Sequence, residues 1–450
     1  MASPKRTIVI GGGFAGLAAA TRLVGPEREL VVLEANKVAG GRSRSFPDKV
    51  TGREIDNGQH LMMGCYHETL AFLDRIGTPR TSIEFQPNLA LTMVKPGGGE
   101  FSIACPSLPA PLHLAAGLLG ARGLGLVNKA AAIRAGVMLG SEIARPDDTE
   151  TCDAWLRRMG QTPALRAMFW EPLIWAVLND DPLVASAAML VAVLERAFMA
   201  SRADSSLGLP RRPLSDLYVG RAQDYLRARG AELRMASPVR ALELEGEGRV
   251  CGVRLKSGER IEADTVISAV PPHALLDLIP EALAAHPVFR DVARLEPSPI
   301  VNLWLTLDRP LLDHPFVGLV GSPLHWLWDR DQIETGTGRG SGKDHLLSVT
   351  ISGARTSVHD TPEALRKLFE VEMRRYFPQA KPEIRSFRVI KEKRATISHA
   401  AGTYLRRPEI RSPLRGLLLA GDWVRTGLPA TIESAVQSGH DAAAIARRAA

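Results

Sequence analysis

The stretch Thr7-Ile8-Val9-Ile10-Gly11-Gly12-Gly13-Phe14-Ala15-Gly16 decides the fold of this chain of 450 residues. Its β-branched run at 7–10 predicts a buried strand, and the apolar spacing over residues 15–23 predicts a helix after the glycines. Residues 30–33 form a second apolar run that predicts another strand. A strand, a glycine turn, a helix and a strand in this order indicate a βαβ unit, which is half of a Rossmann fold.

The glycines of this turn match the pattern that binds dinucleotides. Gly11, Gly13 and Gly16 allow a tight turn and let a pyrophosphate approach the free N–H groups of the helix. Glu34 ends the second strand, where its carboxylate can accept hydrogen bonds from ribose hydroxyls. A carboxylate here disfavours an adenosine 2′-phosphate, so the motif predicts FAD or NAD rather than NADP. Ala15 and Ala35 are expected at the same site.

The composition is that of a globular protein, with 45% hydrophobic and 23% charged residues. A chain of this length exceeds one ordinary core, so we expect two or three domains. The 56 basic and 49 acidic residues give a net charge of +7, but the basic residues form no arm and accompany no aromatic motif. Nucleic acid is therefore not an expected partner. The four cysteines lack the spacing of a metal site, so we expect no metal and a reducing compartment.

The longest apolar stretch, residues 108–127, contains two prolines, four glycines, His113 and Arg122, which exclude a membrane-spanning helix. The stretch could instead lie on a membrane surface, with Arg122 and Lys129 beside its leucines, or line a buried channel. Only six residues precede the first strand, which leaves no room for a signal peptide. We therefore expect a cytoplasmic protein, either free or peripheral at the inner face of the cytoplasmic membrane.

The hydrophobic period changes along the chain. Helical spacing dominates from about 108 to 209, and strand alternation returns between 232 and 268. Two more strands are predicted at 301–307 and 345–351, with a glycine-rich loop at 336–342 between them. A last strand and helix are predicted from 416 to 448.

A second glycine turn, Gly40-Gly41-Arg42, can place a fixed cation against phosphate oxygens, although alone it could be an ordinary surface turn. Together with the first motif, Glu34 and the stretch Leu419-Ala420-Gly421-Asp422-Trp423, it resembles the flavin amine oxidase and phytoene desaturase superfamily, which binds FAD. The resemblance implies an α/β protein. A discontinuous Rossmann-type FAD-binding domain would be combined with an α+β substrate domain that includes a helical insert.

The resemblance divides the chain into five segments. The FAD-binding domain would take residues 1–105, 209–280 and 386–450. The helical insert, which faces the substrate or a membrane, would take residues 106–208, and the sheet of the substrate domain residues 281–385.

The same resemblance implies contacts with FAD in several segments. Asp422 would contact the ribityl or pyrophosphate region, and a helix starting near Ala430 would direct its positive end at the flavin ring. Such a helix end favours the anionic reduced flavin by about 0.3 to 1 kcal/mol. Val239 resembles a position whose backbone contacts adenine, although alone it could be an ordinary core valine. The implied contacts are Gly41, Arg42, Val239, Gly421, Asp422, Thr431 and Ile432.

Three further stretches narrow the resemblance: Ile55-Asp56-Asn57-Gly58-Gln59-His60, Trp170-Glu171-Pro172-Leu173 and Gly427-Leu428-Pro429-Ala430-Thr431-Ile432-Glu433. They are similar to the hydroxysqualene dehydroxylases, also called squalene-associated FAD-dependent desaturases. This family implies that reduced FAD supplies a hydride to remove the allylic hydroxyl of hydroxysqualene, giving squalene and water in bacterial hopanoid or related triterpenoid synthesis. The partner would be a long prenyl-chain substrate, and no motif identifies the electron donor.

Removal of a hydroxyl group needs a proton donor and a dry pocket. Gly58 permits close backbone approach, and Gln59 and His60 could lie beside the flavin or the hydroxyl. His60 is the candidate catalytic proton donor because an ordinary histidine pKa of about 6.5 suits transfer near neutral pH. Alternatively, it is a hydrogen-bonded histidine that only orders the site. Trp326 and Trp328 share one strand face and either line a lipid cavity or pack in a core.

Three other functions remain open at this stage. A carotenoid or phytoene desaturase would use the same cofactor site with the opposite electron flow. A flavin amine oxidase is disfavoured because only 5% of the residues are aromatic, which leaves few for an amine cage. A non-enzymatic prenyl-lipid carrier of the GDP-dissociation-inhibitor type would share the fold without flavin, and the intact Gly13, Glu34, Arg42 and Asp422 argue against it.

Overall fold

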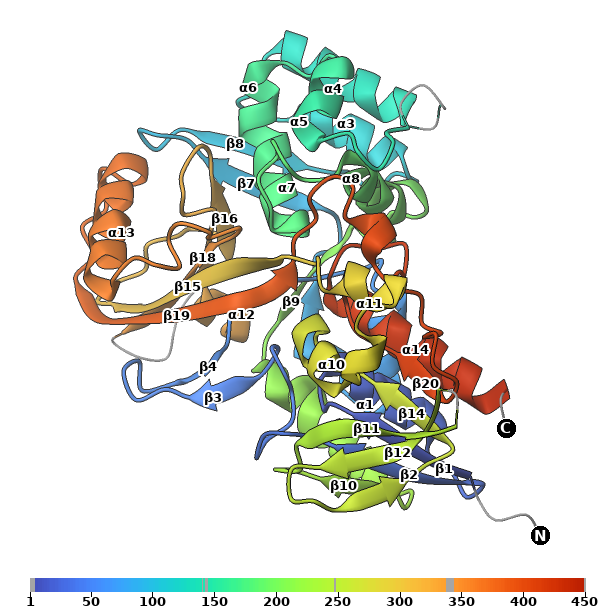
Figure 1. Cartoon of the computed structure of the whole chain (residues 1–450). Helices are drawn as coiled ribbons and strands as arrows, with labels where there is room; N and C mark the ends of the chain where they lie inside the picture. Colours follow the sequence, from blue (N-terminus) through green and yellow to red (C-terminus); the bar gives the residue numbers. More distant parts are fainter. Residues whose placement is uncertain (1–4, 140, 142–144, 247, 337–343, 449–450) are drawn as a thin grey trace.

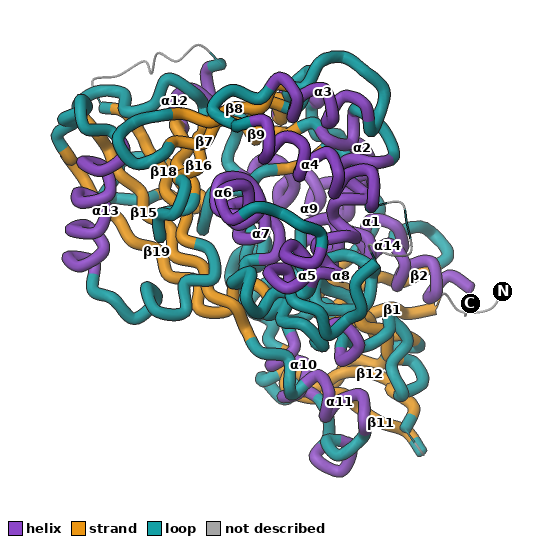
Figure 2. Tube along the Cα trace, turned by 90° about the horizontal axis from the view of Figure 1, so that it is seen from above, coloured by secondary structure: helices purple, strands orange, loops and turns teal. Residues whose placement is uncertain are grey.

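The computed structural model describes residues 5–139, 141, 145–246, 248–336 and 344–448. Figure 1 shows a parallel sheet with its helices, a larger mixed sheet beside it, and a group of helices at the top of the view. The two ends of the described chain lie on the same side of the molecule in both views (Figures 1 and 2). The predicted α/β fold is confirmed.

The predicted βαβ unit forms at the start of the chain. Its central strand β1 (Lys5–Ile10) lies in the middle of a five-stranded parallel sheet with the order β10-β2-β1-β14-β20. This sheet joins segments from the start, the middle and the end of the chain. The other elements are α1 (Phe14–Leu23), β2 (Arg28–Leu33), β10 (Glu232–Arg234), β14 (Thr265–Ser268) and β20 (Leu417–Leu419).

Both faces of the parallel sheet are buried, and successive side chains of a strand point to opposite faces. Val9 packs with α1 and the last helix, α14 (Ile432–Arg448), on one face. Ile8 and Ile10 pack with an antiparallel three-stranded sheet on the other face. The elements on that second face are β11 (Val239–Glu245), β12 (Arg249–Leu255), β13 (Arg260–Glu262), α10 (Pro272–Leu278) and α11 (Pro287–Val292).

The mixed sheet has seven strands in the order β19-β15-β18-β17-β16-β7-β8. Helix α13 (Pro362–Tyr376) covers one face, where Phe369 packs against Val301 and Leu303. The opposite face carries Trp326 and Trp328 toward the helical insert. The strands are β7 (Ala90–Val94), β8 (Glu100–Ala104), β15 (Pro297–Leu307), β16 (Phe316–Leu319), β17 (Trp326–Asp329), β18 (His345–Ile351) and β19 (Ile384–Ile397).

The predicted helical insert is a cluster of short helices, which is seen from above in Figure 2 and packs against the mixed sheet. It contains α3 (Leu112–Gly120), α4 (Leu126–Met138), α5 (Cys152–Arg158), α6 (Pro163–Leu165), α7 (Glu171–Leu178), α8 (Ala187–Leu194) and the π-helical turns η3 (Arg166–Trp170) and η4 (Glu195–Met199). Among the described residues no helix is both long enough and apolar enough to span a membrane.

Shorter elements connect these parts. The strands are β3 (Ser45–Pro47), β4 (Glu54–Asp56), β5 (Met62–Met63), β6 (Ile83–Phe85) and β9 (Leu207–Pro210). The helices are α2 (His67–Arg75), α9 (Gly220–Arg227) and α12 (Arg330–Thr335). The remaining helical turns are η1 (Arg80–Ser82), η5 (Ala203–Ser205), η6 (Ser215–Val219), η7 (Glu281–Leu283) and η8 (Tyr404–Arg406).

The division into five segments stays a prediction, and the strand pairing differs from it in two places. β7 and β8 belong to segment 1–105, yet β7 pairs with β16 of the mixed sheet. Most of β19 belongs to segment 386–450, yet it pairs with β15. Local periodicity identifies a strand but not its partner, which explains both differences. The glycine-rich loop predicted at 336–342 falls, apart from Gly336, outside the described residues.

Candidate active site

A single cavity of about 1170 Å³ extends from the carboxyl ends of β1 and β2 to the inner faces of the mixed sheet and the helical insert. Ligands of parallel α/β sheets bind at this end of the strands. Of the sixteen residues named from the sequence, the cavity is lined by Gly11, Gly13, Ala15, Glu34, Ala35, Gly41, Arg42, Gly58, Gln59, His60, Val239, Gly421, Asp422, Thr431 and Ile432.

The structure needs glycine at each of the three motif positions, but for different reasons. A Cβ on Gly11 would stand 2.8 Å from the oxygen of Ala269, and the residue has φ +109°. A Cβ on Gly16 would stand only 1.9 Å from the oxygen of Gly11, so this glycine packs the helix on the turn and does not line the cavity. A Cβ on Gly13 would meet no protein atom closer than 4.0 Å, and it would project into the cavity. Gly13 therefore keeps space open for a ligand.

Glu34 is buried and held by backbone N–H groups. Its carboxylate accepts hydrogen bonds from the N–H of Gly12 at 2.8 Å and from the N–H of Asn36 at 2.8 Å. The side-chain amide of Asn36 also donates to Oε1 at 2.8 Å. These bonds fix the carboxylate at the cavity wall, and Oε2 retains a lone pair that a ribose hydroxyl can use. The residue fits the role predicted for it.

Arg42 and Asp422 lie 380 positions apart in the sequence and form an ion pair, with Nη2 2.6 Å from Oδ1. The other terminal nitrogen of Arg42 donates to the oxygen of Ala395 at 2.8 Å. The guanidinium is thus oriented on one side by protein acceptors. A fixed cation, the amino end of α1 and the open space at Gly13 form a cradle that fits a pyrophosphate.

The amino end of α14 is ordered by a histidine that no sequence motif indicated. His399 is only 3% exposed; its Nε2 accepts the N–H of Ala430 at 2.7 Å, and its Nδ1 donates to the oxygen of Leu178 at 2.7 Å. Acceptance at Nε2 requires the neutral imidazole, with its proton on Nδ1. Burial lowers the pKa of His399 to about 4. His399 therefore fixes the turn that presents Thr431 and Ile432 to the cavity.

The cavity is also lined by Gly58, Gln59 and His60. Each of these residues contacts another group of the protein. A Cβ on Gly58 would stand 2.6 Å from Nδ2 of Asn302, so this glycine serves a close protein contact. Gln59 accepts a hydrogen bond from Arg330 at 3.0 Å. His60 donates from Nδ1 to the oxygen of Gly58 at 2.6 Å. Burial lowers the pKa of His60, which leaves a neutral ring with Nε2 as an acceptor and makes proton donation at neutral pH harder.

The other half of the cavity is apolar. Trp326 and Trp328 both line it, with ring centroids 6.1 Å apart, as one of the two sequence interpretations predicted. Phe316 stacks on Trp328 at 5.2 Å. The apolar wall also includes Leu61, Met63, Leu89, Leu91, Ile103, Leu114, Phe169, Leu173, Val177, Val193 and Phe198.

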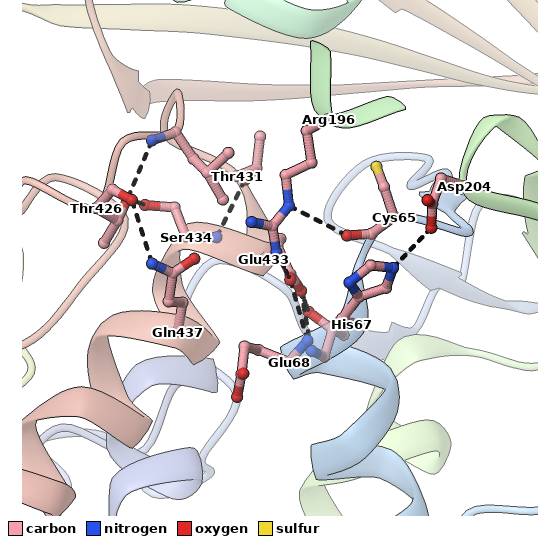
Figure 3. A network of polar contacts seen from close by, with 12 residues as sticks. Cys65, His67, Glu68, Arg196, Asp204, Thr426, Thr431, Glu433, Ser434 and Gln437 are labelled. Atoms are coloured by element: carbon pink, nitrogen blue, oxygen red, sulfur yellow. Dashed lines mark hydrogen bonds and ion pairs between the residues drawn. The ribbon is translucent and has the colours of Figure 1, made fainter. Parts of the chain in front are cut away.

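Figure 3 shows a polar network at the edge of this apolar half. Glu433 accepts hydrogen bonds from the N–H groups of Glu68 and Thr69, at 3.0 and 2.9 Å, and so caps the amino end of α2. Arg196 pairs with the same carboxylate at 2.8 Å, and its Nε donates to the oxygen of Cys65 at 3.3 Å. Sequence reasoning missed Arg196, since its partner Glu433 lies 237 positions away.

We predict that Gly13→Val folds but loses FAD, because the new side chain enters space that only a ligand uses. Flavin content of the purified protein and its unfolding midpoint measure the two effects. Gly220→Ala is a matched control, because a Cβ there meets nothing within 4 Å, and it should keep both. Gly16→Val should fail to fold. Yellow Gly13→Val protein with one FAD per chain would contradict the prediction.

We predict that His399 makes the protein less stable as the pH falls. The folded state holds this pKa at about 4, whereas an unfolded histidine has about 6.5, so the unfolded state binds an extra proton between these values. The free energy of unfolding should fall by up to about 3 kcal/mol from pH 6.5 to pH 4 on this account. Denaturant unfolding of holoprotein, repeated across this pH range, should show that the free energy of unfolding changes less with pH in His399→Asn than in the wild type. If the free energy of unfolding fell equally with pH in both proteins, His399 would not be the cause of the loss of stability.

Comparisons with known proteins agree with this geometry. A model of the family described as flavin containing amine oxidoreductase matches residues 14–446. The hydroxysqualene dehydroxylases of Sinorhizobium fredii and Zymomonas mobilis are 31% and 29% identical, and each alignment covers 98% of both chains. The 15-cis-phytoene desaturase of Synechococcus elongatus is 25% identical over 96% of this chain and 94% of its own. An oxidoreductase from Methanosarcina mazei has the same fold, with a TM-score of 0.76 at 17% identity over 97% of this chain and 99% of its own.

The family match over residues 14–446 includes both Arg42 and Asp422, which meet in the pyrophosphate cradle. The cradle has the space, the fixed cation and the helix end that FAD requires. The resemblance to a flavin superfamily that the sequence indicated is confirmed. The chain belongs to the flavin-containing amine oxidoreductase family and is an FAD-dependent oxidoreductase.

Proposed function

We propose that this protein removes the allylic hydroxyl group of hydroxysqualene, giving squalene and water. The observation that carries the proposal is the continuity of the cavity, which joins the glycine-rich cradle to a long apolar half without a separating wall. Its volume of about 1170 Å³ exceeds the roughly 300 to 1,000 Å³ of ordinary ligand sites. The names of the bacterial relatives support the same substrate.

The apolar half suits a hydrocarbon chain and a reaction that water would disturb. Its wall is built from leucines, valines and the aromatic rings of Phe316, Trp326 and Trp328. Such a wall excludes water, which protects an electron-deficient allylic carbon from being captured by water. When bound and reduced, FAD supplies the hydride that this carbon takes up. His60, which lines the cavity, stays the candidate for delivering the proton, and its Nε2 would first have to take up that proton.

We also propose that the helices α3 and α4 dock on an anionic membrane surface. Leu126 and Val127 are 84% and 74% exposed, and Leu112 and Leu119 on α3 are more than half exposed. Residues 101–141 contain no acidic side chain, while Arg122, Lys129 and Arg134 are basic. Exposed apolar residues flanked by basic ones favour anionic lipid surfaces. Leu114 of α3 lines the cavity, so the docked helices would lie beside the lipid that enters it.

The test of the reaction is a single anaerobic turnover. Holoprotein reduced with dithionite and mixed with hydroxysqualene should return to the oxidised flavin spectrum, with one squalene formed per flavin. Squalene added instead of hydroxysqualene is the control and should leave the flavin reduced. A flavin that stays reduced with hydroxysqualene would refute the proposal. Bleaching of the oxidised protein by phytoene in the same instrument would favour a desaturase instead.

The test of membrane docking is flotation with vesicles that contain phosphatidylglycerol. The wild-type protein should float with these vesicles and less so in high salt, because the basic side chains contribute to binding. Replacing Leu126 and Val127 together by Glu should lower binding about tenfold or more. Val371→Glu is the control, since Val371 is 44% exposed on α13, in another part of the molecule. Equal flotation of the double variant and the wild type would exclude this surface.

A further inference from the structure

Arg196 is an exception in the apolar half of the cavity. Between residues 61 and 207 it is the one charged residue that lines the cavity, within the described part of the chain. The carboxylate that holds it, Glu433, is only 1% exposed and already accepts bonds from two N–H groups of α2 and from the hydroxyl of Thr69. Glu433 therefore has its hydrogen bonds as a helix cap without a guanidinium, and Arg196 adds a counter-charge to this buried carboxylate.

Arg196 has hydrogen-bond donors to spare. Its Nε donates to the oxygen of Cys65 and its Nη2 to Glu433, and among the described residues Nη1 has no partner. The unpaired nitrogen of Arg196 is not sealed inside the protein, and 33% of the side chain is exposed. Arg196 lines the cavity, so the free Nη1 is available to a ligand bound there. Figure 3 shows the side chain fixed between these two acceptors at the start of α14.

We propose that Arg196 receives the hydroxyl oxygen of the substrate and stabilises it as the C–O bond breaks. This inference rests on the proposed dehydroxylation. In that reaction the electron pair of the C–O bond leaves with oxygen, the carbon takes up a hydride from the reduced flavin, and one proton converts the leaving hydroxide to water. An arginine does not give up its own proton in proteins, so Arg196 donates hydrogen bonds and the proton comes from another group or from water.

The surroundings suit an arginine better than a lysine. A guanidinium is planar and carries its N–H donors in fixed directions, so two of its nitrogens can be held while the third stays free to donate. The carbonyl of Cys65 takes Nε and the carboxylate of Glu433 takes Nη2, which fixes the direction of Nη1. Donors aimed in advance at a developing negative charge in a dry site are worth far more than the same donors in water. Glu433 acts through Arg196 and is a positioning residue.

The test compares Arg196→Met and Arg196→Lys with the control Arg166→Met. Arg166 also lies in a π-helical turn of the insert and forms a partly buried ion pair with Asp153, but it does not line the cavity. Two readouts are measured: the affinity of the oxidised holoprotein for hydroxysqualene and for squalene, from flavin difference spectra, and the single-turnover rate after reduction. The affinity ratio reports on recognition of the hydroxyl group without any turnover.

We expect the wild-type protein to bind the alcohol more tightly than the hydrocarbon, and Arg196→Met to lose this preference by about 10- to 100-fold with squalene affinity unchanged. The rate should fall by about 100- to 1,000-fold. Arg196→Lys should recover part of the preference but little of the rate. Arg166→Met should match the wild type in both readouts.

A preference and a rate within twofold of wild type in Arg196→Met would overturn the assignment while leaving the proposed function intact. A wild-type protein that neither converts nor prefers hydroxysqualene would overturn the proposed function and this assignment together. If Arg196→Met does not fold because Glu433 is left as a buried unpaired charge, the double variant with Glu433→Gln removes both charges and gives the same two readouts.

Discussion

Helix α14 lies so close to α1 that only glycine fits at position 439, where a Cβ would stand 2.2 Å from the oxygen of Ala15. On the other side of α1, Gly16 packs against the oxygen of Gly11 with still less room. Contacts between backbones at this distance leave no freedom to slide, because protein interiors are close-packed. Helices α1 and α14 are therefore fixed against each other. The part of the cavity that they border is rigid for the same reason.

The polar contacts of the site depend on this placement of α14. Asp422, which precedes the helix, meets Arg42 from the first segment. Ala430 is held by His399, and Glu433 reaches α2 and Arg196 from the first turn of the helix. A shift of one helical turn, about 5.4 Å, would break all of these contacts together. One buried helix thus organises the pyrophosphate cradle and the polar edge of the apolar half.

The cofactor half could be predicted from the sequence because its requirements are local. A glycine turn between a strand and a helix, and an acid at the end of the next strand, each leave a pattern within a few residues. Arg196 and His399 left none, since their partners Glu433 and Ala430 lie 237 and 31 positions away. Gly16 was predicted as part of the cofactor site, but its contact is with Gly11. The strands β7 and β8 were missed as parts of the mixed sheet because periodicity does not reveal pairing partners.

We propose that one continuous cavity holds both FAD and the prenyl chain, so that hydride can pass directly between them. The most direct test is a crystal structure of the holoprotein with hydroxysqualene bound to the oxidised enzyme. The account predicts a flavin ring against Thr431 and Ile432 and a chain that extends from it along Trp326, Trp328 and Leu114. A lipid bound outside this cavity, or a wall of side chains between the ring and the chain, would contradict it.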